Sequence, residues 1–519
     1  MCNYKEQALQ EYNSEATAAH PGGVNGRPFW NVNASQFTFA PSFQFPSVPY
    51  SGKYRFTATD RNGAEHVFEA DQPTASLAPI WGEIPTGFVT LKVESLGNLT
   101  GKVQYLIGAR TFFKSEPFPG RDAYPPRPRS YREAARMAYR FVFEDDMVHH
   151  WLTHGTPKPD YAHNVYPSKT ISSVIHAMIT YASIDPEKAE DALTLARRAA
   201  DFLLSISFPV GHPLEGLPPT YSFEGLDEEA VNKVARAAKG LVGTVMMLYP
   251  VSAGLAYLDL AQATKDEKYF AAALKIADFY KKNRHPSGSW YLVYDCATGA
   301  PTKDNLCMDF QFVDFFHLLH ERTGDVTWKQ MEEDYLNFIK ETCLKDYTWD
   351  AQFEDSPIIG NYGNLAHFTA SRYIRYIAEN QADDPQAMEA ARDLMRFVED
   401  QFVVWGEFAY WSEEKIRERH TPAGLEQYFC YRPIDANTAL ITQAFRSMYQ
   451  ATGERLYLEK ALTLADVIAR RQHEDGGIPT FFEGENCAHG RRNYWINCQV
   501  ISAGTLKDFA DLTEAEGIE

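Results

Sequence analysis

The sequence has few cysteines for its length, and none of their spacings matches a metal or redox motif. The seven are Cys2, Cys296, Cys307, Cys343, Cys430, Cys487 and Cys498. No two of them are separated by only two residues, as zinc ribbons and thiol redox motifs require. They are also too widely spread to form the disulfide framework of a small secreted domain. We therefore expect them to be small core residues.

An excess of positive charge is also missing. The chain has 50 Lys and Arg against 69 Asp and Glu, which gives a formal net charge of -19 and a pI of about 5.3. A nucleic-acid partner is not expected, because such proteins gather basic residues on one surface. An anionic ligand would need a local cluster of basic residues to offset the negative charge of the rest of the protein.

Long apolar runs are scarce as well. The opening segment, "MCNYKEQALQEYNSEATAAH", contains no apolar run that could form the core of a signal peptide, so the chain as written is expected to be cytoplasmic. It would be periplasmic or secreted if a natural leader had been removed. Residues 240–258 reach the length of a membrane span, about 18 residues, but Pro250 and several glycines and serines favour a loop and a buried helix. No membrane partner is therefore expected.

Motifs for cofactors are not found either. The sequence has no glycine-rich phosphate loop and no closely spaced His and carboxylate ligands. We expect neither a metal nor an organic cofactor.

Residues 28–113 have the pattern of β-strands. In "KYRFTATDRNGAEHVFEA", apolar and polar residues alternate on both sides of Asn62-Gly63, a pair suited to a tight hairpin turn. "FVTLKVESLGNLTGKVQYLIGARTFF" repeats this alternation. We predict a small antiparallel β-sandwich domain here, after an N-terminal extension over residues 1–27.

A proline-rich connector follows at residues 114–130, "KSEPFPGRDAYPPRPRS". Proline fixes φ and removes backbone donors, so neither a helix nor a central strand persists through such a segment. It predicts a linker, and the pattern is helical from Tyr131 onward.

An internal repeat dominates the helical part. "ATKDEKYFAAALKIADFYKKNRHPSGSWY" begins at Ala263, "ATGERLYLEKALTLADVIARRQHEDGGIP" begins at Ala451, and the two align without a gap. Each copy predicts an amphipathic helix that is preceded by a more apolar helix and closed by a glycine-containing turn. Because His285 and His473 recur at the same place, we assign them to these turns.

Weaker relatives of the repeat raise the number of helical hairpins to about six, which predicts a closed ring. The fold class we predict is mainly α: an (α/α)6 toroid over residues 131–519. Its inner helices should be apolar on most sides, and its outer helices should keep one charged face.

A β domain followed by about six hairpins, with closures such as "HPSGSWY" and "HEDGGIP", resembles the six-hairpin (α/α)6 carbohydrate-active enzymes. These include glycoside hydrolases that act on uronic acids, polysaccharide lyases and sugar epimerases. More locally, "WDAQFED", "NLAHFTA", "LEQYFCYRPIDAN" and "NYWINCQ" resemble a bacterial family of β-glucuronidase-like glycoside hydrolases. The resemblance implies an oligosaccharide or polysaccharide substrate, which is anionic if it carries a uronic acid, and a cleft between the loops at one end of the ring.

Hydrolysis of a glycosidic bond usually requires two carboxyl groups. The candidates in the quoted segments are Asp355, Glu426 and Asp435, of which Asp355 and Glu426 are preferred. Glu354 adjoins Asp355 and points to the opposite side of an extended chain, so it is assigned to substrate binding or to backbone contacts of the loop. Asp435 is equally well explained as a helix N-cap.

His367 is a candidate for acid/base chemistry or for contact with a sugar carboxylate, and it is equally compatible with a buried, hydrogen-bonded histidine at a helix start. Tyr362 and Tyr428 offer phenol hydroxyls for substrate binding. Arg432 could clamp a uronate in bidentate fashion or form a surface salt bridge.

Three further residues have the polar and aromatic character of a sugar-binding loop: His163, Tyr166 and Trp495. The preferred function is a hydrolase of a uronic-acid-containing glycan. A lyase that uses Tyr and His for β-elimination, a sugar epimerase and a non-catalytic glycan-binding protein remain alternatives. The sequence leaves the oligomeric state open.

Overall fold

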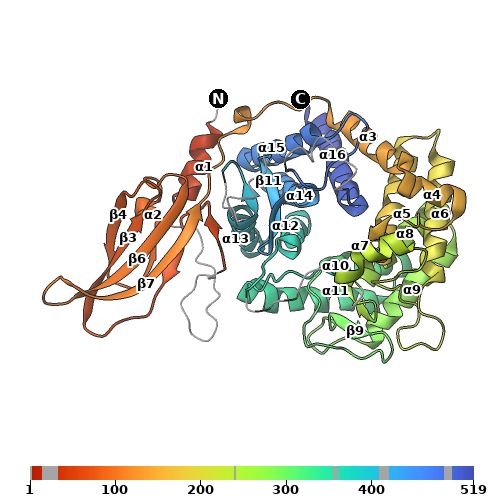
Figure 1. The fold of residues 1–519 in the computed structure, drawn as a ribbon, viewed down its shortest axis with the longest axis horizontal. Helices are drawn as coiled ribbons and strands as arrows, with labels where there is room; N and C mark the ends of the chain where they lie inside the picture. Colours follow the sequence, from red (N-terminus) through yellow and green to blue (C-terminus); the bar gives the residue numbers. More distant parts are fainter. Residues whose placement is uncertain are drawn as a thin grey trace.

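The computed structural model describes residues 3–14, 33–238, 241–354, 358, 360, 362–407, 420–483 and 494–518. Strands fill the N-terminal part, and a ring of helices fills the rest (Figure 1). Helix α1 (Tyr4–Tyr12) lies between the sheet and the ring. Among the described residues, no helix is both long enough and apolar enough to cross a membrane.

The strands form one five-stranded sheet in the order β1-β7-β6-β3-β4, antiparallel except for the β1–β7 pair. Its strands are β1 (Gln36–Phe37), β3 (Ser51–Thr59), β4 (Glu65–Ala70), β6 (Gly87–Gly97) and β7 (Val103–Lys114). The predicted hairpin turn at Asn62-Gly63 joins β3 to β4, and Gly63 has a φ of +82°, which only glycine adopts without strain.

The sandwich prediction holds only in part. The antiparallel strands are present, but the sheet curls into a half-barrel and lacks a full second sheet among the described residues. Only the short pair β2 (Ser42–Gln44) and β5 (Thr74–Ser76) and helix α2 (Ala78–Trp81) accompany it. The two sheets meet through aromatic side chains: Phe43 of β2 packs against Phe37 and Phe112 of the main sheet, and the three rings have centroid distances of 5.3 to 5.9 Å.

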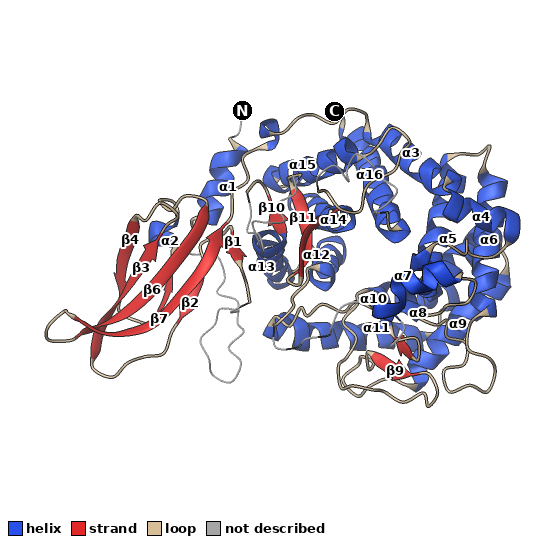
Figure 2. Ribbon diagram, viewed as in Figure 1, coloured by secondary structure: helices blue, strands red, loops and turns tan. Residues whose placement is uncertain are grey.

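The helices pack in six pairs: α5–α6, α8–α9, α10–α11, α12–α13, α14–α15 and the closing pair α16–α3 (Figure 2). The inner helices are α5 (Pro167–Ile184), α8 (Leu248–Thr264), α10 (Gln311–Thr323), α12 (Phe368–Asn380), α14 (Asp435–Thr452) and α16 (Ile496–Glu516). The outer helices are α3 (Tyr131–Glu144), α6 (Ala189–Ser205), α9 (Glu267–Lys282), α11 (Val326–Phe338), α13 (Pro385–Phe402) and α15 (Arg455–Arg471). The α/α toroid is thus as predicted.

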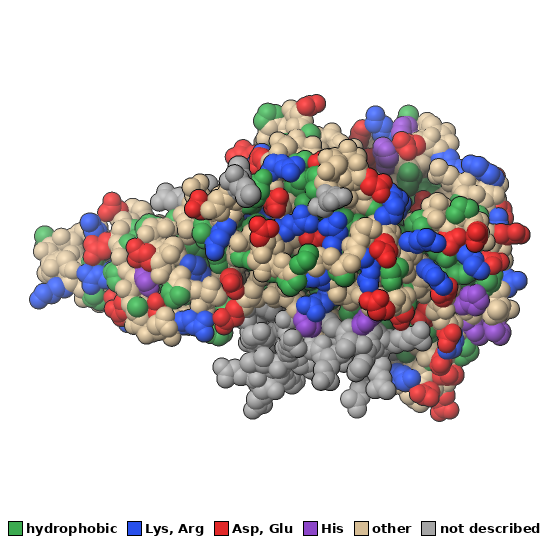
Figure 3. All heavy atoms as spheres, turned by 90° about the horizontal axis from the view of Figure 1, so that it is seen from above, with side chains coloured by type: hydrophobic (Ala, Val, Ile, Leu, Met, Phe, Trp, Pro, Cys, Tyr) green, Lys and Arg blue, Asp and Glu red, His purple; other side chains and the backbone are tan. Residues whose placement is uncertain are grey.

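Smaller elements lie in the connections between the main helices of the ring. They are the helices α4 (Asp146–His154) and α7 (Glu228–Ala238) and the strands β8 (Thr244–Met246), β9 (Val293–Asp295), β10 (Val403–Val404), β11 (Ala423–Gln427) and β12 (Cys430–Ile434). On the face seen from above, acidic and basic side chains are interspersed (Figure 3). This face of the described surface therefore has no large patch of one sign.

The repeat is visible in atomic detail. Helices α9 and α15 begin at Glu267 and Arg455, which are equivalent positions of the two aligned copies. In the first closing turn, the amide of Gly288 donates to the carbonyl of His285 at 2.9 Å; in the second, the amide of Gly476 donates to that of His473 at 3.0 Å. Both glycines have φ near +95°. The two histidines therefore belong to equivalent turns, as predicted.

The N-terminal segments are fastened to the ring through two successive residues of α13. Glu399 accepts a hydrogen bond from the hydroxyl of Tyr12 at 2.6 Å and pairs with Lys460 at 2.7 Å. Asp400 accepts from the amides of Thr38 and Phe39, at 2.6 and 2.8 Å. These groups are buried, so the contacts have little competition from water.

Candidate active site

A cavity of about 520 Å³ lies where the six inner helices begin. Each of the six contributes residues to it: Lys169, Ser172, Ser173 and His176 from α5; Leu248, Tyr249 and Ser252 from α8; Gln311 from α10; Phe368, Thr369 and Arg372 from α12; Ala436 and Asn437 from α14; and Asn497, Cys498, Val500 and Ile501 from α16. Most of these residues lie in the first two turns of their helices. Helix N-termini carry partial positive charge, so six such ends converge on the cavity.

Loops and short strands complete the wall. They contribute Asp309, Trp349 to Phe353, Ala366, Glu426, Gln427, Cys430, Ile434, Thr480, Phe481 and Trp495. Polar side chains alternate with aromatic rings in this set, which is typical of a site for a sugar.

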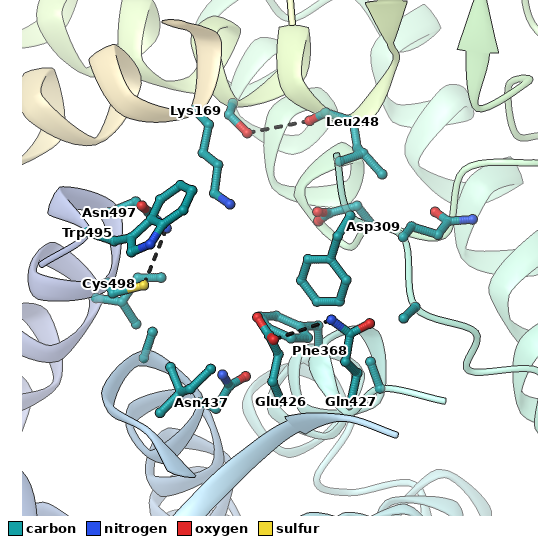
Figure 4. Close-up of a pocket in the computed structure, with 18 of the residues that line it drawn as sticks. Lys169, Leu248, Asp309, Phe368, Glu426, Gln427, Asn437, Trp495, Asn497 and Cys498 are labelled. Carbon is teal, nitrogen blue, oxygen red and sulfur yellow. Dashed lines mark hydrogen bonds between the residues drawn. The ribbon is translucent and has the colours of Figure 1, made fainter. Parts of the chain in front are cut away.

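Glu426 is the predicted catalytic residue that lines this cavity. It lies near the end of β11, is partly exposed and accepts a hydrogen bond of 3.3 Å from the side chain of Gln427. Figure 4 shows Glu426, Asp309 and Lys169 pointing into the cavity from different sides. The loop predicted to hold a carboxyl group therefore reaches the cavity.

Asp355, the other preferred candidate, lies outside the described residues. Glu354 is fully buried just behind the cavity wall. It accepts a hydrogen bond from Lys169 Nζ at 2.6 Å and another from the hydroxyl of Tyr249. Burial would raise the pKa of Glu354, but these two donors outweigh it and lower the pKa. Its partners, rather than Glu354 itself, face the cavity.

Asp435 is the first residue of α14, not its N-cap, which is Ile434. Its side chain is fully buried, and Ser502 Oγ donates to Oδ2 at 2.8 Å, while Oδ1 has no hydrogen-bond partner among the described residues. Burial raises the pKa of Asp435 to about 8, so the carboxyl group is mostly protonated at neutral pH. It lies behind the cavity wall, between the lining residues Ile434 and Ala436.

His367 is fully buried between α12 and α14. Its Nδ1 lies 3.0 Å from Ser371 Oγ, and its Nε2 lies 2.8 Å from Asn437 Oδ1. Asn437 can only accept through this oxygen, so Nε2 carries the proton and Nδ1 accepts from Ser371. Burial lowers the pKa of His367 to about 4. The ring is neutral at pH 7 and links the starts of α12 and α14.

The two predicted tyrosines are engaged within the protein. Tyr362 has a positive φ of 61°, and its hydroxyl donates to the carbonyl of Asp346 at 2.7 Å. Tyr428 is buried, and its hydroxyl donates to Gln401 Oε1 at 3.0 Å. Neither residue lines the cavity.

Arg432 forms a bidentate ion pair with Glu483, at 2.8 and 3.3 Å, and its guanidinium lies 3.7 Å from the ring centroid of Phe481. Phe481 lines the cavity and Arg432 does not. The bidentate geometry predicted for a uronate is thus used for a protein carboxylate.

His163 and Trp495 form a stacked pair, with centroids 3.6 Å apart and ring planes 15° apart. Tyr166 lies next to Trp495, with centroids 5.9 Å apart. Burial lowers the pKa of His163 to about 4, and the nearby Lys169 contributes to the same shift. Only Trp495 of the three lines the cavity, and Lys169 Nζ lies 4.9 Å from its ring centroid.

The sequence reasoning missed four charged residues of the cavity: Lys169, Asp309, Asp350 and Arg372. A signal existed for two of them. Asp309 lies two residues before the apolar helix α10, and Asp350 opens the segment that carries Glu354. Lys169 and Arg372 lie inside helices, where a single sequence does not distinguish the side of the ring axis from the outer surface. Among the described residues, no group of three or more His, Cys, Asp or Glu side chains is arranged to hold a metal ion.

No protein-family profile matches this sequence, and no curated protein matches it. Solved structures do. One is a D-mannose isomerase, 11% identical, with a TM-score of 0.52 over 74% of this chain and 97% of that one. This likeness shows the fold. The chain is an α/α toroid like that enzyme.

Two weaker likenesses are to a family 76 glycoside hydrolase from a bovine Bacteroides thetaiotaomicron strain and to an unsaturated glucuronyl hydrolase from Streptococcus agalactiae. The first is 11% identical, with a TM-score of 0.47 over 94% of this chain and 99% of that one. The second is 13% identical, with a TM-score of 0.45 over 73% and 91%. The likeness to the D-mannose isomerase and the helix pairs of this chain confirm the predicted α/α toroid. Membership of the β-glucuronidase-like family is not shown.

Proposed function

We propose that the protein is a glycoside hydrolase that acts on a uronic-acid-containing glycan bound in this cavity. The observation that carries the proposal is the position of Glu426: a carboxylate on a short strand that projects into a cavity lined by aromatic and amide groups. Glycosidic bonds are cleaved between two carboxyl groups, one of which protonates the leaving oxygen while the other attacks the anomeric carbon or activates water.

The remaining lining suits a sugar. Aromatic rings offer flat apolar faces, and side-chain amides offer both donors and acceptors to hydroxyl groups. The aromatic lining residues are Tyr249, Trp349, Phe353, Phe368, Phe481 and Trp495. The amides are Gln311, Gln352, Gln427, Asn437 and Asn497.

The helix N-termini supply the positive charge that favours an anionic substrate here, although the net charge of the chain is -19. Six helix N-termini point their partial positive charge at the cavity, and Lys169 and Arg372 line it. Both cations are ion-paired, with Glu354 and Asp309, which fixes their positions. A uronate carboxylate bound beside them would share these fixed positive charges.

The lyase alternative finds less support. A lyase would use a tyrosine and a histidine. Of the candidates of these types, Tyr362 and Tyr428 bond their hydroxyls to other protein groups, and His367 is buried. An isomerase or epimerase moves a proton between sugar carbons and often uses histidine for it. His176 lines the described cavity and is paired with Asp259 at 2.7 Å, an arrangement that orients a histidine for proton transfer and makes an isomerase or epimerase the second candidate.

The test is product analysis with a panel of uronate-containing oligosaccharides. Hydrolysis releases free uronic acid that does not absorb as an unsaturated uronate, whereas a lyase produces that absorbance and an isomerase releases no smaller sugar. Glu426→Gln should lose at least roughly 100-fold in turnover, because general acid/base groups contribute 10² to 10⁴. The matched control is Glu187→Gln, at an exposed glutamate before α6, which should be fully active.

A further inference from the structure

We infer that Asp350 is the proton donor opposite Glu426. The inference rests on the proposed hydrolase function and names the second carboxyl group of that reaction. Asp350 lines the same cavity as Glu426. It lies in the segment before Glu354, where the sequence directed attention to other residues.

The backbone brings the two residues to neighbouring positions. Asp350 pairs with Leu365 in an antiparallel bridge, and the next residue, Ala366, pairs with Gln427, which adjoins Glu426. Three extended segments therefore lie side by side, and the two carboxylates belong to the outer two. Adjacent strands are about 4.8 Å apart, and Glu426 is offset from Asp350 by two residues along the strands, so the two α-carbons are about 12 Å apart. Inverting glycosidases separate their carboxyl groups by about 6.5 to 9.5 Å to admit a water molecule, and this backbone spacing leaves room for one.

The surroundings of Asp350 favour the protonated carboxyl group. Trp349 on one side is buried, and Oδ1 of Asp350 is itself buried with no hydrogen-bond partner among the described residues. Burial raises the pKa of Asp350 to about 7, and only the backbone amide of Tyr362 opposes this shift. An acid with a pKa near neutrality holds a proton and can still release it.

No described cation acts on Asp350 to reverse this effect. The titratable groups that interact with it are the Cys343 thiol and the Tyr362 phenol. Burial raises the pKa of both, that of Cys343 to about 12, so both are neutral at pH 7. The proton on Asp350 therefore depends on burial alone.

Asp309, the third carboxyl group of the cavity, is differently placed. Its Oδ1 accepts from Arg372 and from the amide of Gln311, at 2.8 and 2.9 Å, and its Oδ2 accepts from the side chain of Gln311 at 3.0 Å. Both oxygens are already engaged as acceptors. Asp309 fixes Arg372 and has no oxygen available to carry a proton to substrate.

The reaction step is a single displacement. Asp350 gives its proton to the glycosidic oxygen while the bond between that oxygen and C1 breaks, and the electron pair of the bond remains on the oxygen. The oxygen of a water molecule bonds to C1 on the opposite face, and Glu426 accepts the proton that this water releases. The products are an alcohol and a sugar with inverted configuration at C1, after which one proton must pass from Glu426 through solvent to Asp350.

The test compares Asp350→Asn with wild type on two substrates of the same sugar, one with a poor alcohol leaving group and one with a nitrophenol. Asp350→Asn should lose roughly 10² to 10⁴ in kcat/KM on the alcohol substrate. It should lose far less on the nitrophenyl substrate, since nitrophenolate leaves without protonation. The decline of kcat/KM above pH 7 in wild type should disappear. Asp350→Glu keeps a proton donor and should recover part of the activity.

Asp346→Asn is the matched control, at an exposed aspartate of the same segment that does not line the cavity, and it should behave as wild type. Equal losses by Asp350→Asn on both substrates, or an unchanged decline above pH 7, would overturn the inference while leaving the hydrolase function intact. Release of the product with retained configuration would overturn the single displacement. Absence of hydrolysis by wild type on every substrate would overturn the proposed function and this inference together.

Discussion

Lys169 and Glu354 are far apart in the sequence, and Lys169 Nζ donates to Glu354 Oε1 at 2.6 Å. Lys169 lies in the first turn of α5, and Glu354 follows the segment that carries Asp350. The side chain of Glu354 has no exposure, whereas that of Lys169 is 22% exposed on the cavity side. This ion pair fixes a positive charge at the edge of the cavity.

Glu354→Gln should destabilise the protein by roughly 3 kcal/mol at pH 7, because removing one member of a buried pair leaves its partner uncompensated. Partial exposure of Lys169 keeps the loss at the lower end of the usual range. The pair lowers the pKa of Glu354, so its contribution is complete above the unfolded value of 4.5 and is lost as pH falls through the folded-state value. Urea unfolding at pH 7 and pH 4 measures both effects.

The control for this variant is Asp160→Asn, which breaks the more exposed pair between Lys158 and Asp160. Exposed pairs contribute about 0 to 1 kcal/mol, so this variant should unfold almost as wild type does. Equal losses in the two variants would contradict a special role for the Lys169 pair.

Asp435→Asn should change the pH dependence of stability. The pKa of Asp435 is raised to about 8 in the folded protein, whereas an unfolded aspartate has 3.8. The folded state thus holds a proton that the unfolded state releases, and wild type loses stability as pH rises from about 4 to 8. Asparagine at this position cannot release a proton, so the variant does not lose stability in this way. Between about pH 4 and 8, its unfolding free energy relative to wild type should therefore rise by about 1.4 kcal/mol per pH unit. Unfolding at pH 5.5, 6.5 and 7.5 gives this slope.

Asp435→Asn also tests whether Asp435 takes part in catalysis. Asp435 lies behind the cavity wall, so Asp435→Asn should keep turnover within a few-fold of wild type. A loss of about 100-fold in a folded variant, the size expected for an acid/base group, would restore Asp435 as a catalytic candidate.

His367→Gln should change the pH dependence of stability in the opposite direction to Asp435→Asn. The pKa of His367 is lowered to about 4 in the folded protein, against 6.5 when unfolded, so its contribution to stability rises with pH between these values. The stability difference between wild type and variant should therefore be about 2 kcal/mol larger at pH 7.5 than at pH 5. A difference that does not change with pH would mean that folding leaves the pKa of His367 unshifted, and it would contradict the assignment as a buried, neutral ring.

Tyr12→Phe tests the attachment of the N-terminal helix to the ring. It removes the hydroxyl that donates to the buried Glu399 at 2.6 Å, which should cost about 1 to 3 kcal/mol in unfolding free energy. Tyr50, which is 85% exposed, provides the control, and Tyr50→Phe should change stability by less than about 0.5 kcal/mol. Similar effects of the two substitutions would contradict the role of the Tyr12 hydroxyl.

The ring could be predicted from sequence because its signal is local and repeated. Helical periodicity, a glycine turn and a gapless alignment identify the same hairpin at two places in the sequence. The turns at Gly288 and Gly476 have the same geometry, which confirms that the two copies are equivalent. The half-barrel could not be distinguished from a sandwich, since strand patterns do not show what covers the buried face. Here the short β2–β5 pair, which carries Phe43, covers part of that face in the described residues.

The site could be predicted only to the level of segments. The segment that resembles a glycosidase loop drew attention to Asp355, which lies outside the described residues. Asp350, earlier in the same segment, pairs with Leu365 and lines the cavity. Asp435 and His367 are buried, whereas Glu426 is partly exposed. The residues that bury them come from distant parts of the chain, so this difference cannot be seen in the local sequence. Pairing such as that of Arg432 with Glu483 likewise appears only once the loops are placed.

The measurement that tests the central claim most directly is hydrolysis in ¹⁸O-labelled water of a disaccharide of two 4-linked uronic acids, with the products analysed by mass at early times. We predict one labelled oxygen in the released uronic acid, no unsaturated product, and loss of the reaction in Glu426→Gln but not in Glu187→Gln. Unlabelled products with an unsaturated uronate, or an isomerised disaccharide with its linkage intact, would contradict the assignment as a glycoside hydrolase.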